Sequence, residues 1–358
     1  MDELLTELGE LKALVASIEP VNAALMDHKN SVVQRYITIR RRFDYAAFTV
    51  ALYASFEKFV ENLITAYVRL EARRVDYAKL PQKLTDKHLT RTAELLWRRR
   101  VGEGRYVGMS ELGVVRNLFA CLSGAKPYVL NEAVVTAHDA NLRAAEVDDV
   151  FGAVGIDNVC ERACRADAII AWYCTDQALD MPPQGGVKRA VIEGRLKDIV
   201  ERRNQVAHRG GNVDNLLGGE AMGGSVAFIE SLATAIFGLV VARYLETHHA
   251  NSASRIELSL RAGESRLRAG KVVILDKPAQ KLFVGQPVFV LMKTSGARWG
   301  RVQSLRIDGA DVQEVASNAN APEGVGVGLD FKFPKGGTTL VALATEDDVV
   351  WNPSAPVG

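Results

Sequence analysis

The segment Glu201–Gly211 brings together side chains that can handle a phosphate and a proton. It reads Glu-Arg-Arg-Asn-Gln-Val-Ala-His-Arg-Gly-Gly, so a guanidinium, a carboxamide and an imidazole lie at one expected helix end, before two glycines. Arg203 can pair with a phosphate and stabilise its charge in a transition state. Histidine readily takes up and releases a proton near neutrality, so His208 can act as general base or acid. Asn204 can orient the histidine or a phosphate oxygen.

The chemistry that these groups support is the cleavage of RNA through its own 2′-hydroxyl. That hydroxyl lies next to the scissile phosphate, so the nucleophile is already within reach. A histidine can move the proton and an arginine can stabilise the phosphate charge, so neither a metal nor a cofactor is required. The segment therefore predicts an endoribonuclease whose products carry a 2′,3′-cyclic phosphate and a 5′-hydroxyl.

The Arg-x-x-x-x-His spacing is a weak pattern by itself, because this chain contains it twice. Arg243 and His248 repeat it at the end of another expected helix. Cations near a helix C-terminus are stabilised by the helix dipole, and this alternative explains both matches without any chemistry. The first match differs because Asn204 precedes His208 by four residues, which places the two side chains on one helix face.

Helix geometry raises a question about Arg203. At about 100° per residue, Arg203 lies about 140° around the helix from His208, so one regular helix does not aim both side chains at one phosphate. A distorted last turn, which Gly210 and Gly211 would favour, is one solution. The other solution is a second subunit that completes the site.

The rest of the chain must supply the elements that position this segment. Apolar residues recur at helical spacing through the first two-thirds of the chain. We expect helices at 4–18 (interrupted at Pro20), about 21–42, 43–75, 159–179, 187–209 and 226–247, with shorter helices between 76 and 155. From residue 251, short segments of period two alternate with turns, and strands are expected at 255–260, 271–275, 287–292, 302–307, 311–315, 328–333 and 338–344.

These patterns predict a mainly α fold with two domains. A helical domain spans residues 1–250 and contains an insert at about 76–155, and a small all-β domain, a barrel or a sandwich, spans residues 251–358.

Three separated segments resemble the HEPN (higher eukaryotes and prokaryotes nucleotide-binding) superfamily, in its RiboL-PSP-HEPN branch. Arg203, Asn204 and His208 match the Arg-Asn-x-x-x-His signature. Phe43-Asp44-Tyr45 together with Ala54–Glu61 resembles the second helix of that branch. Asn141-Leu142-Arg143, followed by Val147, Val150-Phe151 and Val154-Gly155-Ile156, resembles a third segment. The resemblance covers roughly residues 30–247.

The resemblance implies a HEPN-like helical bundle and a metal-independent endoribonuclease, of a kind often found in toxin or phage-defence systems. It implies a homodimer whose paired motifs form one composite cleft, an RNA substrate such as a tRNA or a phage transcript, and an antitoxin or defence-system partner. In the family an acidic residue of the long helix often lies near the motif, which makes Glu57 the supporting residue here. The alternative is that Glu57 and Glu61 belong to a solvated face. Residues 251–358 are outside the resemblance.

Other basic groups can contribute to RNA binding. The runs Arg40–Arg42, Arg73-Arg74 and Arg98–Arg100 can follow a phosphate backbone, or they are solvated helix ends.

Composition describes an ordinary globular chain, with 48% hydrophobic and 24% charged residues and a net charge of +1. The acidic start Met1-Asp2-Glu3 is unlike a signal peptide. The apolar run Ser225–Tyr244 contains Glu230, and we expect a buried core helix there rather than a membrane span. The four cysteines lack zinc-site spacing, and Cys160 and Cys164 are one helical turn apart, so we expect these two to be reduced core residues. These features favour a cytoplasmic protein without membrane association.

Two other functions remain open. HEPN-like folds also serve as non-catalytic modules that bind RNA, nucleotides or proteins, and a fold does not certify an activity. The β domain can instead determine specificity, because small barrels bind oligonucleotides on an open face. Its aromatic and cationic candidates are Phe283, Arg298, Trp299, Arg301 and Arg306, with core packing of Phe283 and Trp299 as the default expectation.

Overall fold

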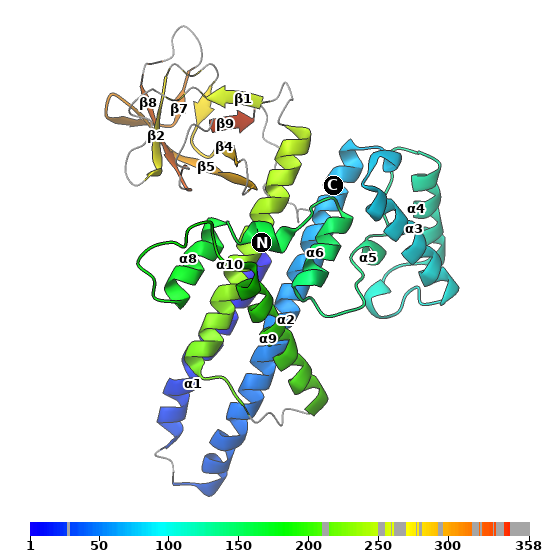
Figure 1. Cartoon of the computed structure of the whole chain (residues 1–358), viewed down its shortest axis with the longest axis vertical. Coiled ribbons are helices and arrows are strands. Elements are labelled where there is room, and N and C mark those ends of the chain that lie inside the picture. Colours follow the sequence, from blue (N-terminus) through cyan, green and yellow to red (C-terminus); the bar gives the residue numbers. More distant parts are fainter. Residues whose placement is uncertain are drawn as a thin grey trace. The chain divides into compact units, whose positions relative to one another are not determined.

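The computed structural model describes residues 1–26, 29–209 and 215–249, and, in the C-terminal part, 255–258, 260, 270–276, 278, 281–292, 296–316, 322, 324–331, 333 and 340–343. The chain divides into two compact units, Met1–Phe237 and Gly238–Gly358. Helices build the first unit, and the strands all lie in the second (Figure 1). The predicted fold class, mainly helical with a C-terminal β region, is confirmed. The predicted domain boundary at 250/251 stays a prediction.

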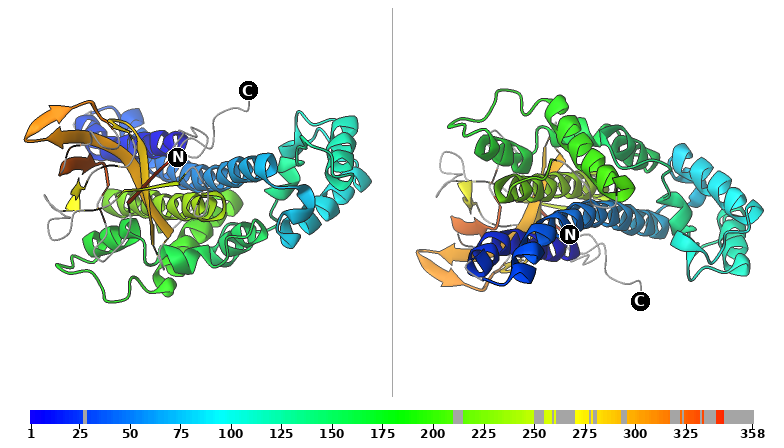
Figure 2. Two further views of the ribbon diagram at one scale, coloured as in Figure 1. Left: turned by 90° about the horizontal axis from the view of Figure 1, so that it is seen from above. Right: turned by 90° about the horizontal axis from the view of Figure 1, so that it is seen from below.

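Four long helices form the bundle that holds the motif: α1 (Asp2–Met26), α2 (Ser31–Arg74), α9 (Arg189–Arg209) and α10 (Gly219–His248). The helices α1 and α9 run in the direction opposite to α2 (Figure 1), and Figure 2 shows α2 and α10 side by side. Each helix buries an apolar stripe, represented by Leu8, Phe56, Ile192 and Leu232. Burying each such side chain stabilises the fold by about 1.5–3 kcal/mol.

The first two helices differ from the sequence prediction. The interruption expected at Pro20 is absent, because α1 continues through it to Met26. Proline has no N–H, so the helix forgoes the hydrogen bond to the Ala16 carbonyl, and packing against α2 compensates for this loss. The helix α2 then runs for 44 residues without a break near residue 42. It begins at Asn30, whose side chain caps it by accepting a hydrogen bond from the Val32 N–H at 2.9 Å.

The insert consists of short helices, as the sequence predicts. They are η1 (Tyr77–Lys79), α3 (Gln82–Trp97), η2 (Gly104–Tyr106), α4 (Glu111–Leu122), α5 (Glu132–Val135) and α6 (Ala144–Ala153). A small core of Leu95, Val114 and Val134 joins α3, α4 and α5. The insert therefore has packing of its own and holds the loop between α5 and α6 in place.

The helix expected at 159–179 is divided into α7 (Val159–Ala163) and α8 (Asp167–Asp176). The chain returns past this break, where the Val187 N–H donates to the Cys164 carbonyl at 2.9 Å. Gly186 permits the approach, because a Cβ there would lie 2.7 Å from the same carbonyl oxygen. All four cysteines are free thiols, and Cys121, Cys160 and Cys164 are buried, as expected for Cys160 and Cys164.

The helix α10 is long and apolar enough to cross a membrane by length and composition alone. Core helices of water-soluble proteins pass the same test. Here 67% of the most apolar stretch of α10 is buried inside the protein, as in a core helix.

The β region is antiparallel, with seven strands in one sheet ordered β1-β9-β4-β5-β8-β2, β6 beside β5, and a separate β3-β7 pair. The strands are β1 (Arg255–Leu258), β2 (Val272–Leu275), β3 (Leu282–Phe283), β4 (Pro287–Met292), β5 (Gly296–Ile307), β6 (Ala310–Val312), β7 (Glu314–Val315), β8 (Val325–Leu329) and β9 (Leu340–Leu343). The strand expected at 328–333 lies three residues earlier, as β8. The short β3 was not predicted.

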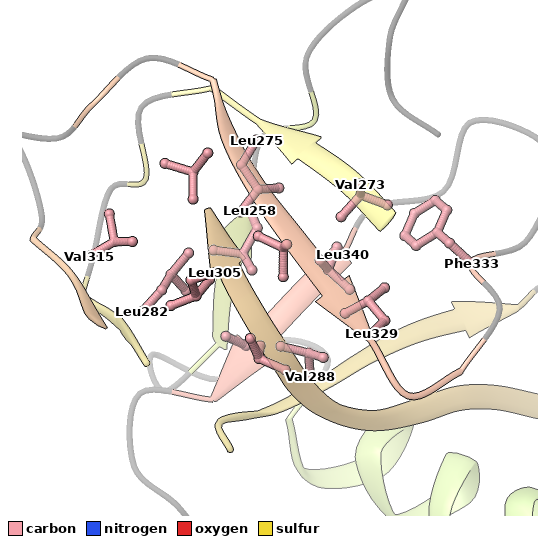
Figure 3. Close-up of a cluster of buried hydrophobic side chains, with 14 of the residues drawn as sticks. Leu258, Val273, Leu275, Leu282, Val288, Leu305, Val315, Leu329, Phe333 and Leu340 are labelled. Carbon is pink, nitrogen blue, oxygen red and sulfur yellow. The ribbon is translucent and has the colours of Figure 1, made fainter. Parts of the chain in front are cut away.

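The long strand β5 lies between β4 and β8 and so joins the two halves of the sheet, β1-β9-β4 and β8-β2. Its first half pairs with β4 and its second half with β8, and the register shifts between Val302 and Ser304. Such a bulge lets a strand bend. Buried Leu and Val side chains from both halves then meet in one core (Figure 3). One bridge joins Leu260 to Leu275, but β1 and β2 are not paired as strands, so within the described residues the sheet is not closed into a barrel.

Two expectations for the β region can be compared with the structure. Phe283 is 37% exposed, so core packing is wrong for this residue. Trp299 is half-buried and lies opposite Phe289 in the β4–β5 ladder. Arg306 forms an ion pair with Asp311, and the Arg301 guanidinium donates to the Gly285 carbonyl, so both cations have partners within the sheet. The side chain of Arg298 lies outside the described residues.

Candidate functional site

The motif lies on the last two turns of α9. The helix is a regular α-helix through Arg209, so the described residues contain no distorted turn between Arg203 and His208. Gly210 and Gly211, which were expected to favour such a distortion, lie outside the described residues. Arg203 and Asn204 are half-buried, and His208 is exposed. Within one chain, therefore, Arg203 and His208 do not face one point.

Asn204 joins α9 to the loop before α6. Its Oδ1 accepts a hydrogen bond from Asn141 Nδ2 at 3.1 Å and another from Arg203 Nη1 at 3.2 Å. The Arg203 guanidinium lies over the Tyr53 ring, with its Cζ 5.2 Å from the ring centroid. A cation over an aromatic face is attracted by about 0.5–1 kcal/mol or more. These contacts fix Arg203 and Asn204 together at the surface of the bundle.

Tyr53 links this cluster to the long helix α2. Its hydroxyl accepts a hydrogen bond from the Leu142 N–H at 3.0 Å and donates one to Glu57 Oε1 at 3.2 Å. Burial raises the pKa of Tyr53 to about 12, so this hydroxyl stays protonated and available as a donor. Glu57 lies one turn along α2 from Tyr53 and is connected through it to Arg203.

A second histidine, His138, lies close to Glu57. His138 Nδ1 is 2.7 Å from the Ala140 carbonyl oxygen, which can only accept, so Nδ1 carries a proton. Its Nε2 is 3.5 Å from Glu57 Oε1 and 3.4 Å from Glu61 Oε1, at ion-pair distance without a well-aligned hydrogen bond. The Glu61 carboxylate is the main cause that raises the pKa of His138, against the opposing effect of burial.

Glu61 has a second cationic partner, because Arg105 Nη2 lies 2.8 Å from the same carboxylate oxygen. Burial raises the pKa of Glu61, but the combined effect of His138 and Arg105 outweighs it, so the pKa lies below its ordinary value. Glu61 is therefore ionised near neutral pH, which favours the charged form of His138.

Glu57, Arg105, His138 and Asn141 help to line a pocket of about 410 Å³. Its walls come from α2 (Glu57), from the loop before α6 (His138 and Asn141) and from the insert (Arg105). Exposed Arg143 and half-buried Glu146 complete it. The pocket offers cations and hydrogen-bond donors as well as carboxylates, a set that can bind a phosphate and exchange a proton.

Arg202 faces elsewhere and serves a structural role. Its guanidinium forms an ion pair with Asp198 at 2.8 Å and donates to the Tyr45 hydroxyl and the Asn215 carbonyl, each at 3.2 Å. The contact with Tyr45 attaches α9 to the N-terminal half of α2. Arg203 is therefore the arginine of this pair that the site can use.

The candidate residues from the sequence are only partly brought together within one chain. Arg203, Asn204 and Glu57 belong to one connected cluster, whereas none of the contacts among the described residues involves the His208 imidazole. Sequence reasoning missed Tyr53, His138 and Arg105 as members of the site. A lone histidine just before Asn141-Leu142-Arg143 was the available signal for His138.

Among the described residues, no group of three or more His, Cys, Asp or Glu side chains is placed to hold a metal ion.

The structure thus shows a helical bundle with the motif helix α9 hydrogen-bonded, through Asn204, to a residue that lines a polar pocket. The family model described as RiboL-PSP-HEPN matches residues 9–242, about two-thirds of the chain. The chain therefore belongs to the RiboL-PSP-HEPN family. The match includes most of α1, which the sequence resemblance left out. No curated protein matches the chain.

Proposed function

We propose that this protein is a metal-independent endoribonuclease that cuts RNA at a cleft completed by two copies of the chain. The observation that carries the proposal is the cluster of Arg203 and Asn204 with Tyr53, Asn141 and Glu57. Asn204 accepts a hydrogen bond from Asn141, which lines a polar pocket, and the same helix α9 carries the exposed His208 near its end.

In this mechanism Arg203 pairs with the scissile phosphate and stabilises its charge as the 2′-hydroxyl attacks. One imidazole takes the proton of the 2′-hydroxyl, and another gives a proton to the departing 5′-oxygen. The bond between phosphorus and that oxygen breaks, and a 2′,3′-cyclic phosphate forms. A twofold dimer supplies two His208 side chains for these roles. Asn204 positions Arg203, and Glu57 acts through Tyr53 and His138 as a positioning residue.

The dimer part of the proposal rests on an exposed apolar stripe of α2. Tyr36, Phe43 and Val50 recur every seven residues and are 53%, 65% and 43% exposed in the single chain. Val32 and Ile39 lie on the same face and are also exposed. An exposed apolar stripe of this kind is typical of a protein–protein interface. Seven residues after Val50 the face carries Glu57, so a second copy covering the stripe would lie next to the cleft.

The decisive test is cleavage of RNA in EDTA. We expect wild-type protein to release 2′,3′-cyclic phosphate ends and His208→Ala to lose activity by about 10²–10⁴-fold, because proton transfer typically contributes that factor. Circular dichroism should show an unchanged fold, since His208 is exposed. His248→Ala is the matched control, because Arg243 and His248 have the same spacing outside the site. Undiminished cutting by His208→Ala would refute the mechanism.

The biological setting is a proposal of the same kind. We infer that the enzyme acts in the cytoplasm within a toxin or phage-defence system, on an RNA such as a tRNA or a phage transcript, and that an antitoxin or defence-system partner restrains it. The support is membership of a family of nuclease and RNA-binding modules. Growth arrest on expression of the wild-type chain, but not of His208→Ala, tests the toxin role.

The second candidate function is a non-catalytic RNA- or nucleotide-binding module. His208 is exposed and lies about 140° around α9 from Arg203, which favours this second function. A binding module needs the phosphate contacts of Arg203 but no proton transfer. RNA binding by wild-type protein without any product would select this function.

A further inference from the structure

A second pocket, on the insert, continues the candidate cleft. Its volume is about 450 Å³, and Arg91, Arg98, Arg100, Arg105 and Tyr106 line it together with His138. Arg105, His138 and Asp139 line both pockets, so the two spaces adjoin. An RNA strand that crosses the first pocket, past Glu57 and Asn141, would therefore enter the second pocket next.

The second pocket has more cations than carboxylates. Arg91 pairs with Glu94 and Asp139, Arg98 with Glu94, and Arg105 with Glu61. Arg100 is exposed, and within the described residues its guanidinium has no ion pair or hydrogen bond. One arginine is therefore left to pair with an incoming anion.

Two arginines of this pocket, Arg91 and Arg105, also act on the charge of Lys87. Lys87 lies one turn before Arg91 on α3. Burial, followed by the charges of Arg91 and Arg105, lowers the pKa of Lys87 to about 8. A lysine gives up its proton more easily where positive charge accumulates, and an anion in the pocket would relieve that repulsion.

An exposed aromatic residue precedes the arginine run. Trp97 ends α3 immediately before Arg98 and is 86% exposed. Large aromatic side chains are rarely left in water without a partner. Aromatic rings beside cationic grooves bind single-stranded nucleic acid by stacking on its bases, while the cations hold its phosphates.

We propose that the insert pocket binds a backbone phosphate of the RNA strand, away from the phosphate that is cut in the adjoining cleft. The inference rests on the proposed function and adds a substrate requirement: a single strand long enough to occupy both pockets. Arg105, His138 and Asp139 mark the path of the strand, since they line both pockets. Arg100 holds the phosphate, and Trp97 stacks on a neighbouring base.

The test is binding of fluorescent single-stranded RNA to the cleavage-deficient His208→Ala chain at several salt concentrations. Removing one phosphate contact lowers the slope of log affinity against log salt by about 0.7 for a single strand. We expect Arg100→Ala in this background to lower the slope by that amount and the affinity by about fivefold. Arg116→Ala, which removes an exposed arginine of α4 outside the pocket, is the charge-matched control and should change neither.

The length of the RNA locates the contact on the strand. We expect Arg100→Ala to weaken the binding of a long oligonucleotide and to leave the binding of a dinucleotide unchanged. Equal penalties with both would overturn the inference, as would equal slopes for Arg100→Ala and Arg116→Ala. If the salt slope changes as expected but wild-type protein cuts no RNA, the insert pocket binds a phosphate and the proposed nuclease function is wrong.

Discussion

Asn204 is the residue on which the contacts of the candidate site converge. One oxygen accepts hydrogen bonds from both Arg203 and Asn141, residues that lie on different elements. The sequence predicted that Arg203 and Asn204 matter, because their types suit phosphate chemistry. It could not place them beside Tyr53 and Asn141, since contacts between residues 60 or more positions apart depend on how the helices pack. The 140° separation from His208, by contrast, follows from helix geometry alone and persists in the structure.

His138 gives a residue-scale prediction. Its raised pKa, caused mainly by Glu61, means that the folded chain keeps the imidazolium to a higher pH than the ordinary value of 6.5. The resulting stability is fully present below pH 6.5 and is lost as the pH rises through the folded pKa. We expect Glu61→Gln to lower the pKa of His138 in an NMR titration.

The control for that titration is Glu3→Gln, which removes an exposed carboxylate on α1 and should leave His138 unchanged. A His138 pKa that is the same in wild type and Glu61→Gln would contradict the assigned ion pair. A sequence pattern could not have revealed this pair, because neither the loop conformation at 138–140 nor the approach of α2 is encoded in local spacing.

At the scale of elements, the long helix α2 connects most of the features described. One face carries the exposed apolar stripe and then Glu57 and Glu61, while Phe48, Phe56 and other buried residues fill the opposite side. Apolar periodicity predicted most of the helices, including the part of α2 after residue 43, but it placed a break near residue 42 that α2 does not have. It failed at Pro20, where packing outweighs the lost hydrogen bond, and at 164–166, where the return of the chain past Gly186 matches a break in the helix.

The insert gives an element-scale prediction through His88. This residue is fully buried, its Nε2 accepts from the Asn131 N–H at 2.9 Å, and its Nδ1 is 3.1 Å from the Tyr77 hydroxyl. Burial lowers the pKa of His88 from 6.5 to about 4. Between these two values the unfolded chain binds a proton that the folded chain does not, so stability falls as the pH falls from 6.5 to 4, by about 3 kcal/mol in all.

Hydrogen exchange of the amides in α3 and α5 measures this effect. We expect their protection to drop between pH 6.5 and 4.5 in wild type and to drop less in His88→Gln, which has no titrating group there. Amides in the β4–β5 ladder serve as an internal reference within the same sample. Identical pH slopes for the two proteins would show that His88 does not carry the acid sensitivity.

At the scale of the whole molecule, the helical and β units pose different questions. The helical unit has a family and a candidate site, and the β unit has an antiparallel core whose strands lie after the end of the family match at residue 242. Alternation predicted most strands, although β4 and β9 bury consecutive residues and not one face alone. Closure could not be predicted from sequence, because it depends on the bulge in β5 and on pairing between strands far apart in the chain. Specificity carried by the β unit remains a proposal.

The central claim is that two chains build one catalytic cleft, and a mixed dimer tests it most directly. Wild-type chains are paired, through two affinity tags, with chains carrying both Arg203→Ala and His208→Ala, and cleavage of RNA is measured in EDTA. A composite cleft predicts that the purified mixed dimer is inactive, because no cleft then has two complete motifs. Half of the wild-type activity would contradict the account, because it would mean that each chain holds a site complete in itself.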